Sequence, residues 1–298
     1  MKKKSKNSAT LFDFQSKYKT EADCLNAIVR LRWPDGFRCI KCNYRGGYKL
    51  NTRRAIECAS CRHQISITAN TVFHKTRVPL LTWFWIIFLV CQDKGGVSAM
   101  RLAKLLGMHY STIWHILQKI RTAMSQRDDK VIRLSGLIEL DEGFFGRKSP
   151  KSQVLVMIES KDGRSGNLVM KRILGTTASQ PEIKRVVEEY VDARFRHRFV
   201  TDCAGAHNVL VKLGHRFEAH LSTPESAAEK LPWVHRAISL AKRFLLGTYH
   251  GIKRKHLQKY LDEFCYRYNR RFQESRLYES LIKACVLGFP ISYPALTR

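Results

Sequence analysis

Apolar residues recur at helical spacing over residues 21–33 and 79–126, and a cysteine-rich, turn-rich stretch to about residue 70 lies between them. The pattern predicts a short helix over residues 21–33, which the sequence Pro-Asp-Gly then ends. A longer helical stretch covers residues 79–126 and is interrupted at residues 94–97 (KGGV). Its most apolar part, residues 78–91, has only 14 residues and includes a proline, whereas a membrane-spanning helix needs about 20. We therefore expect a buried core helix there and no membrane association.

Beyond residue 131 the pattern changes to short β-type runs. These runs cover residues 154–158, 168–173 and 199–201, and a helical segment over residues 181–191 lies among them. Alternation of strands with helices is typical of a mixed α/β domain. Helical spacing then returns in the last hundred residues. The chain is thus expected to be a multidomain α+β protein.

Basic residues outnumber acidic ones throughout the chain. The 298 residues include 53 Lys and Arg against 25 Asp and Glu, a formal net charge of +28. The first hundred residues hold 18 basic and 6 acidic side chains, the second hundred 19 and 11, and the remainder 16 and 8. Each Lys or Arg that neutralises a phosphate releases a counterion, so a chain of this kind is expected to bind nucleic acid. The same balance excludes an acidic, solvating protein.

The N-terminal residues are basic but lack the apolar run of about 7 to 15 residues that a secretory signal requires. We therefore expect the protein to stay in a reducing cytoplasm. Its nine cysteines are then better interpreted as thiols or metal ligands than as disulfides.

Four cysteines form two Cys-x2-Cys pairs with 15 residues between the pairs: Cys39, Cys42, Cys58 and Cys61. The short spacing lets two thiolates reach one ion, and the longer gap lets a β-hairpin bring the second pair round to complete a tetrahedron. The spacing predicts a zinc ribbon with a structural Zn²⁺. The other cysteines have no paired neighbour and are expected to serve packing: Cys24, Cys91, Cys203, Cys265 and Cys285.

Residues 98–124 (SAMRLAKLLGMHYSTIWHILQKIRTAM) have the pattern of a helix-turn-helix. Ala103 lies four residues before Gly107, where the turn needs a left-handed residue, and apolar positions follow at helical spacing. An ordinary helical hairpin with a glycine turn is the alternative. In a helix-turn-helix, side chains of the second helix would face base edges or phosphates in the major groove of double-stranded DNA: His109, Tyr110, Ser111, Thr112, His115 and Lys119.

Two aspartates follow short apolar strands. In residues 137–146 (LIELDEGFFG), the alternation of a strand makes Glu142 face away from Asp141. Residues 199–204 (FVTDCA) lead in the same way to Asp202. Two strand-end aspartates on one sheet could share a hard divalent cation. Either aspartate alone is weak evidence, because a strand-end aspartate more often caps a turn.

The order of these motifs resembles the bacterial insertion-sequence transposases that join a zinc-ribbon N-terminus to an RNase H-like DDE catalytic domain. The resemblance extends from about residue 21 over nearly the whole chain and includes ELDEGFFG, VTDCAGAH, LPWVHRAISLAKRFLLGTYHG and HLQKYLDEFCYRYNRR. It implies an RNase H-like α/β core with a mixed sheet flanked by helices. It also implies that Asp141 and Asp202 are the first two members of a triad that binds Mg²⁺ or Mn²⁺.

The position that matches the family's third acidic residue carries His235. It lies 33 residues after Asp202, and the matching basic residue, Lys242, follows seven residues later on the same helical face. Imidazole suits magnesium less well than a carboxylate does. Three interpretations stay open: His235 binds a metal such as manganese, acts on the nucleophile, or marks an impaired copy. Glu225 and Glu229 are further candidates for a displaced third carboxylate.

The expected organisation has four parts: a basic flexible arm over residues 1–20, a zinc-ribbon domain over 21–72, a helical helix-turn-helix domain over 73–130 and the catalytic domain over 131–298. In the last part, basic side chains are expected to meet DNA phosphates: Lys253, Arg254, Lys255, Arg270 and Arg271. The aromatic residues interleaved with them recur every four positions, which favours core packing: Tyr260, Phe264 and Tyr268.

Together these features predict a transposase that binds terminal inverted repeats and target DNA and that catalyses metal-dependent strand cleavage and strand transfer. Two DNA ends must be held together, so a homodimer or higher oligomer is expected on DNA. Such an enzyme would act in the bacterial cytoplasm, associated with the nucleoid. The alternatives are a catalytically inactive, transposase-derived DNA-binding regulator, which His235 supports, and a structure-selective nuclease on the same fold.

Overall fold

The computed structural model describes residues 10–50, 53–146, 150–161, 163–175, 177–202, 205–220 and 230–297. It divides into two compact units. The first unit comprises Met1–Arg127 and Phe272–Arg298, and the second comprises Asp128–Arg271. The second unit is therefore inserted into the first, because the chain leaves the first unit once and returns to it.

The first unit is mostly helical. Its helices are α1 (Leu11–Lys17), α2 (Glu21–Arg32), α3 (Leu80–Gln92), α4 (Ala99–Leu106), the greater part of α5 (Tyr110–Val131), α11 (Glu274–Leu287) and α12 (Tyr293–Thr297). The α2, α3, α4 and α5 helices confirm the helical segments predicted before residue 126. Gly107 ends α4 with φ of 61°, the left-handed conformation expected of a helix-turn-helix.

Residues 10–17 are part of the packed first unit. The ring of Phe14 is 2% exposed, and its centroid lies 4.4 Å from that of Trp85 and 4.7 Å from that of Phe88. A capping box between Thr10 and Asp13 begins α1. The expected flexible arm is therefore wrong for residues 10–20. Residues 1–9 lie outside the described residues.

The C-terminal residues 272–298 also belong to the first unit. The α11 helix packs against α2 and α3, and the Tyr278 ring on α11 lies 5.6 Å from the ring of Phe14. The backbone N–H of Val72 donates to the carbonyl of Cys285. The unit expected over residues 131–298 therefore ends at residue 271, because α11 packs against α2 and α3.

A small antiparallel sheet follows α2. Its strands are β1 (Gly47–Leu50), β2 (Ala55–Cys58) and β3 (Gln64–Ser66), in the order β1-β2-β3. The β1–β2 hairpin lies between the two cysteine pairs, as the ribbon spacing predicted.

The second unit is built on a five-stranded mixed sheet. Its strands are β4 (Leu137–Phe145), β5 (Ser152–Lys161), β6 (Arg164–Arg172), β7 (Arg198–Asp202) and β8 (Arg216–His220), in the order β6-β5-β4-β7-β8. The β4, β5 and β6 strands pair antiparallel, whereas β7 and β8 run parallel to β4. This mixed sheet, flanked by helices, confirms the predicted α/β core.

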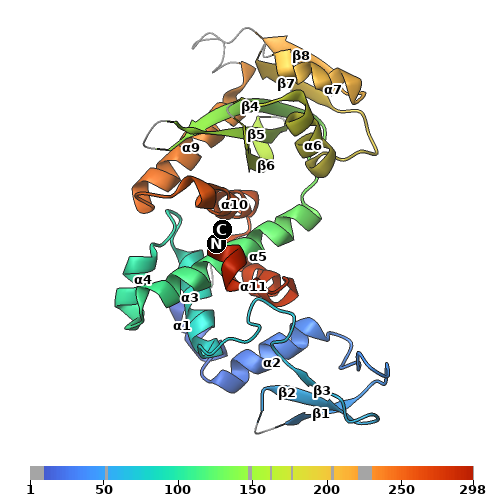
Figure 1. Ribbon diagram of the computed structural model, residues 1–298, viewed down its shortest axis with the longest axis vertical. Coiled ribbons are helices and arrows are strands. Elements are labelled where there is room, and N and C mark those ends of the chain that lie inside the picture. Colours follow the sequence, from blue (N-terminus) through green and yellow to red (C-terminus); the bar gives the residue numbers. More distant parts are fainter. Residues whose placement is uncertain are drawn as a thin grey trace, which may run out of the picture. The chain divides into compact units, whose positions relative to one another are not determined.

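Helices cover both faces of this sheet (Figure 1). One face packs against α9 (Pro232–Thr248) and α10 (Leu257–Asn269), with the short η2 turn (Arg254–His256) before α10. The other face packs against α6 (Gln180–Tyr190), the η1 turn (Gly205–Asn208) and α7 (Val209–Lys212). Side chains of β4 alternate between these two cores, so successive residues of the strand face different helices.

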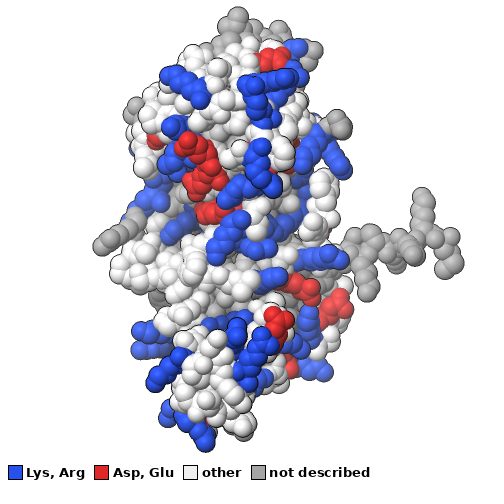
Figure 2. Space-filling model, turned by 90° about the vertical axis from the view of Figure 1, so that its right-hand side faces the viewer, with Lys and Arg blue, Asp and Glu red and all other residues white. Residues whose placement is uncertain are grey.

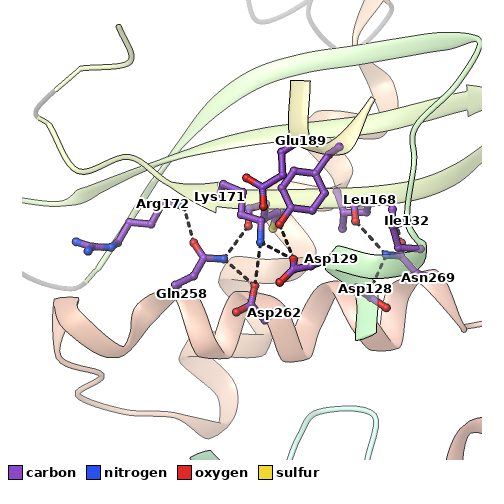
Figure 3. A network of polar contacts seen from close by, with 12 residues as sticks. Asp128, Asp129, Ile132, Leu168, Lys171, Arg172, Glu189, Gln258, Asp262 and Asn269 are labelled. Atoms are coloured by element: carbon purple, nitrogen blue, oxygen red, sulfur yellow. Dashed lines mark hydrogen bonds and ion pairs between the residues drawn. The ribbon is translucent and has the colours of Figure 1, made fainter. Parts of the chain in front are cut away.

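A polar network ties α10 to β6 and to the start of the second unit (Figure 3). The Lys171 ammonium lies 3.2 Å from a carboxylate oxygen of Asp129 and 3.7 Å from one of Asp262. The Asn269 side chain bonds the backbone N–H and carbonyl of Leu168. These contacts fix α10 across the edge strand of the sheet.

Among the described residues, no helix is both long enough and apolar enough to cross a lipid bilayer.

A close approach between β4 and α9 generates a prediction. A Cβ atom at Gly143 would come within 2.8 Å of the Phe145 ring and 3.3 Å of Ile238 on α9. We expect Gly143→Val to push α9 from the sheet and to lower the free energy of unfolding by about 1–3 kcal/mol. Urea denaturation measures the change.

Gly247→Ala is the matched control. A Cβ atom at Gly247, inside α9, meets nothing within 4 Å, so this change should be neutral or stabilise the helix by up to about 1 kcal/mol. Equal stability of the Gly143→Val variant and the native chain would contradict the close packing of α9 on β4.

Candidate functional site

The four cysteines predicted as zinc ligands lie together. Their sulfur atoms are all within 4.8 Å of one another, with 3.6 Å between the sulfurs of Cys39 and Cys61 and 3.5 Å between those of Cys42 and Cys58. A tetrahedron with Zn–S bonds of about 2.3 Å has edges of about 3.8 Å, so the donor set fits zinc. Asn43 and Arg62, which follow the two pairs, adopt left-handed backbone conformations with φ of 62° and 57°.

Backbone N–H groups favour the thiolate form of these cysteines, which is the form that binds a metal cation. The N–H groups of Cys42 and Lys41 lower the pKa of Cys39 to about 6. The N–H of His63 favours the thiolate of Cys61, but the neighbouring sulfurs outweigh it and raise the pKa of Cys61 to about 12. The four sulfur atoms lie close together, so a negative charge on one of them disfavours a negative charge on the others. A dication among them would remove that competition and stabilise all four thiolates.

The two predicted aspartates lie on adjacent strands. Asp202 is the last residue of β7, whereas Asp141 lies in the middle of β4, so the strand-end position predicted for Asp141 is wrong. The parallel pairing of β4 with β7 runs from Leu137 and Arg198 to Leu140 and Thr201. Asp141 and Asp202 are the next residues of the two strands, so they lie side by side. The two side chains are 13% and 30% exposed, which leaves them accessible from solvent.

Asp141 is held in a setting that disfavours its negative charge. Burial, together with the charges of Asp202 and Glu142, raises its pKa to about 6, although the backbone N–H of Glu142 and the nearby His235 favour the ionised form. The N–H of Glu142 donates to Oδ1 of Asp141 at 2.7 Å. A carboxylate of this kind gains most from a cation placed beside it.

The α9 helix brings His235 to Asp141. The Nδ1 atom of His235 lies 3.5 Å from Oδ2 of Asp141. The Nε2 atom of His235 is buried and has no hydrogen-bond partner among the described residues. His235 is therefore a neighbour of the aspartates, with a ring nitrogen that another group can engage. Glu225 and Glu229, the other candidates for a third acidic position, lie outside the described residues.

A buried glutamate fixes the start of α9. Glu139 is 2% exposed and shares the face of β4 that carries Asp141. Its Oε2 atom accepts the N–H groups of Trp233 and Val234 at 2.8 and 2.9 Å, in the first turn of α9. No side chain within α9 caps the start of the helix, so the Glu139 carboxylate on β4 accepts these N–H groups instead. The contact positions His235, which is the next residue of the helix.

On the opposite face of β4, a histidine joins two carboxylates. The fully buried His207 side chain lies with Nε2 3.0 Å from Oε1 of Glu142 and with Nδ1 3.1 Å from Oδ1 of Asp202. Burial lowers the pKa of His207, but these two carboxylates outweigh it and raise the pKa to about 9. At neutral pH the ring is therefore a cation that donates to both. Glu142, Asp202 and His207 also offer ligand atoms within 4.8 Å of one another, so a metal ion here would compete with the proton of His207.

Lys242 lies further along α9. It is exposed, and its ammonium is 5.8 Å from the centroid of the Phe145 ring at the end of β4. The structure thus places Lys242 on the same helix as His235, beside the strand that carries Asp141.

The strand pattern and the family resemblance predicted Asp141, Asp202, His235 and Lys242 but missed the supporting residues. His207 stands in the quoted motif VTDCAGAH, five residues after Asp202, and Glu142 follows Asp141 directly. That both residues stand in the quoted motifs was the signal in the sequence that could have identified them. Nothing local to Glu139 indicates that it caps a helix almost a hundred residues away.

The helix-turn-helix residues differ in exposure. Tyr110 and Ser111 are exposed at the start of α5, where the ring of His109 lies 2.7 Å from the Ser111 hydroxyl. Thr112, His115 and Lys119 are half-buried, and burial lowers the pKa of Lys119. The first turn of α5 is therefore the part best placed to reach another molecule.

The basic residues predicted in the second unit fall into two groups. Lys253, Arg254 and Lys255 are exposed around η2. Arg270 instead pairs with Asp128 at 2.7 Å, and the Arg271 guanidinium donates to the carbonyls of Ser165 and Gly166. These internal contacts leave Arg270 and Arg271 little surface for a DNA phosphate. Tyr260 and Phe264 are buried in the core under α9 and α10, and Tyr268 packs against it, as their spacing predicted.

Two family models match the chain. The ISXO2-like transposase domain matches residues 133–269, and the transposase zinc-ribbon domain matches residues 19–64. The first match coincides with the second structural unit, and the second match covers α2 and the cysteine cluster. None of the curated proteins compared with the chain matches it.

Solved structures show distant likenesses. A chain of the simian T-cell lymphotropic virus intasome is 12% identical with a TM-score of 0.31; the match covers 55% of this chain and 63% of that one. A chain of the Mos1 strand transfer complex is 13% identical with a TM-score of 0.29 and coverage of 70% and 79%. A chain of the pre-cleavage Mos1 transpososome is 12% identical with a TM-score of 0.25 and coverage of 66% and 76%.

Removal of one ribbon cysteine should release the metal. We expect the native chain, purified without added zinc, to contain about one zinc ion, and Cys58→Ser to contain none and to lose order in the ribbon. Elemental analysis and hydrogen exchange measure these changes. Cys91→Ser, which alters a half-buried cysteine outside the cluster, is the control and should keep its zinc. Zinc-free native protein with an ordered ribbon would contradict the assignment.

The raised pKa of Asp141 predicts a pH-dependent stability. Between pH about 4 and 6 the folded protein keeps a proton that the unfolded chain releases, so the free energy of unfolding falls as pH rises through this window. Asp141→Asn removes this penalty. The metal-free variant should be more stable than the native chain at pH 8, by on the order of 1–3 kcal/mol, and nearly equal to it at pH 4.

Urea denaturation of both proteins, each without divalent metal, at the two pH values measures the difference. Asp35→Asn, at an exposed site, is the control and should change nothing. If the Asp141→Asn variant is less stable than the native chain at pH 8, the neighbours of Asp141 already stabilise its negative charge and the prediction is wrong.

Proposed function

We propose that this chain, which belongs to the transposases that carry a zinc ribbon and an ISXO2-like transposase domain, cleaves DNA strands and transfers them. We assign the strand-cleavage and strand-transfer reaction to the second unit. We assign the recognition of DNA ends to the first unit.

The convergence of Asp141 and Asp202 carries the proposal. The two carboxylates leave adjacent parallel strands at the same level, and both are partly exposed. Carboxylate oxygens are the ligands that Mg²⁺ and Mn²⁺ prefer. Asp141 and Asp202 would therefore hold the divalent cations. When bound, such cations clamp the attacking and leaving oxygens of an in-line displacement at phosphorus.

His235 would complete the site as its third member. Its Nδ1 atom is near Asp141, and its Nε2 atom has no partner among the residues described. A neutral imidazole in this place suits Mn²⁺ better than Mg²⁺. The geometry therefore supports a working site with a histidine, rather than the loss of the third acidic residue.

Glu142 and His207 would act as positioning residues. The His207 ring binds Oδ1 of Asp202 and Oε1 of Glu142 from the buried side of the sheet. This restrains the rotation of the Asp202 carboxylate and sets the direction of its oxygens. Lys242 would hold a phosphate next to the cleaved bond and offset the charge that develops there.

The first unit would recognise DNA. Its zinc ribbon and the first turn of α5, with Tyr110 and Ser111 exposed, are the parts proposed to contact the terminal inverted repeats. Lys and Arg side chains are spread widely over the face shown in Figure 2, whereas Asp and Glu gather in smaller groups. Broad basic surfaces of this kind suit contacts with phosphates along a duplex. Because strand transfer joins two ends to a target, at least two copies are proposed to assemble on DNA.

A cleavage assay tests the proposal. The substrates are labelled duplexes copied from either flank of the gene that encodes the chain, incubated with Mg²⁺ or Mn²⁺. We expect site-specific cleavage by the native protein and a loss on the order of 10³-fold or more in Asp141→Ala and Asp202→Ala. Both variants should still bind the duplexes in a gel-shift experiment.

Glu188→Ala is the control, because Glu188 is an exposed carboxylate on α6 of the same unit. His235→Glu restores the acidic pattern and should shift the preferred metal from Mn²⁺ to Mg²⁺. Full activity in Asp141→Ala or Asp202→Ala would end the assignment. Specific binding by the native protein without any cleavage would favour the DNA-binding regulator instead.

A further inference from the structure

Two arginines stand side by side on the first cysteine knuckle, residues 38–45. Arg38 and Arg45 flank the first Cys-x2-Cys pair and form an antiparallel bridge. The two backbone hydrogen bonds of this bridge, 3.0 and 3.2 Å long, join the residues on either side of the arginines. Arg38 and Arg45 are therefore a non-hydrogen-bonded pair, the type in which Cα atoms are about 4.5 Å apart and side chains lie closest. The two side chains thus leave the same side of the backbone.

Neither guanidinium has a partner within the described part of the chain. Both side chains are exposed, and no hydrogen bond or ion pair joins either guanidinium to another described residue. The other arginines of residues 37–66 each have a partner: Arg53 has Gln64, Arg54 has Glu21 and Arg62 has Glu57. Arg38 and Arg45 thus differ from every other arginine of the ribbon.

This pairing is unfavourable unless an anion compensates it, because like charges on directly opposite residues destabilise a pair of strands. No Asp or Glu occurs between residues 36 and 56, and Lys41 adds a third exposed cation in the same turn. Cys39, which follows Arg38, is 2% exposed and points to the opposite side of the backbone. The negative charge of the thiolates therefore offsets the repulsion from the buried side only, and the solvent side stays cationic.

The side chains and their surroundings indicate which anion fits. A guanidinium has a planar fork that donates two parallel N–H groups to the oxygens of one phosphate. Two such forks from adjacent positions can hold one phosphate between them. The long stretch without acidic residues favours a polyanion over a small anion, because acidic side chains would repel its neighbouring phosphates. In a transposase, that polyanion is DNA.

We propose that Arg38 and Arg45 share one backbone phosphate of DNA. This inference rests on the proposed function, which assigns the recognition of DNA to the first unit. Contacts to phosphates position a protein on a duplex but carry no sequence information. The first knuckle would thus hold the duplex in place whatever its sequence, while the reading of bases falls to other parts of the unit, such as the first turn of α5.

Binding titrations without divalent metal test this site on two duplexes, one copied from a flank of the gene and one with the same bases in scrambled order. We expect Arg38→Ala and Arg45→Ala each to weaken binding of both duplexes about tenfold, the contribution of a hydrogen bond to a charged group. Because the two arginines share a phosphate, the double variant should lose little more than either single variant. Its slope of log affinity against log salt should fall by about one, since one phosphate contact is lost.

Arg62→Ala is the matched control, because Arg62 is an exposed arginine of the same ribbon that is already paired with Glu57 at 3.2 Å. It should bind both duplexes nearly as tightly as the native chain does. The zinc content of every variant is measured beside its affinity. A variant that keeps the zinc of the native protein has kept its ribbon, so its loss of affinity comes from the missing guanidinium.

Three results would overturn the proposal. The first is unchanged binding in both single variants. The second is a double variant that loses about a hundredfold, the product of two independent contacts. The third is a loss confined to the flank duplex, because a contact to a phosphate does not depend on sequence. Metal-dependent cleavage of the flank duplexes is a separate readout, so the phosphate site can fail while the proposed function stands, and the reverse.

Discussion

The parallel register between β4 and β7 is the constraint on which the site of the second unit depends. Because side chains of a strand alternate between two faces, a shift of one residue would turn Asp141 toward the opposite helices while Asp202 stayed in place. The two cores prevent such a shift. Ile138 and Leu140 of β4 are buried on one side, and Phe145 is buried on the other. Hydrophobic packing on both faces thus fixes the position of two charged groups.

The same strand carries three carboxylates, and each meets a different partner. Glu139 accepts backbone N–H groups of α9, Glu142 contacts His207, and Asp141 lies near His235. Burying negative charge is costly unless it is compensated, so this arrangement spreads the cost over three sites. The compensation is incomplete at Asp141, which accepts one backbone N–H at 2.7 Å and has His235 3.5 Å away, and its pKa is raised to about 6. This arrangement favours cation binding. A cation beside Asp141 would relieve the unfavourable free energy of the Asp141 charge in the metal-free fold.

Much of the site could be predicted from the sequence because its signals are local. The two cysteine pairs have ligand spacing, and strand alternation placed Glu142 opposite Asp141. The residues that hold the site in shape were not predictable in this way. Glu139 and His207 act through contacts with elements far along the chain, and a single sequence gives no measure of such contacts.

The boundaries of the second unit also could not be predicted from local sequence patterns. Residues 272–298 continue the helical pattern of α10, so the sequence offered no reason to separate them. What ends the unit is the pairing of its two ends: Asp128, its first residue, forms an ion pair of 2.7 Å with Arg270. The Asn269 amide also donates to Asp128. A domain whose entry and exit are held together can be inserted into another without straining either, because the host chain is interrupted at one place only. The helices after residue 271 are then available to pack with α2 and α3. Arg270, expected at the DNA surface, thus has a structural part in closing the domain that carries Asp141 and Asp202.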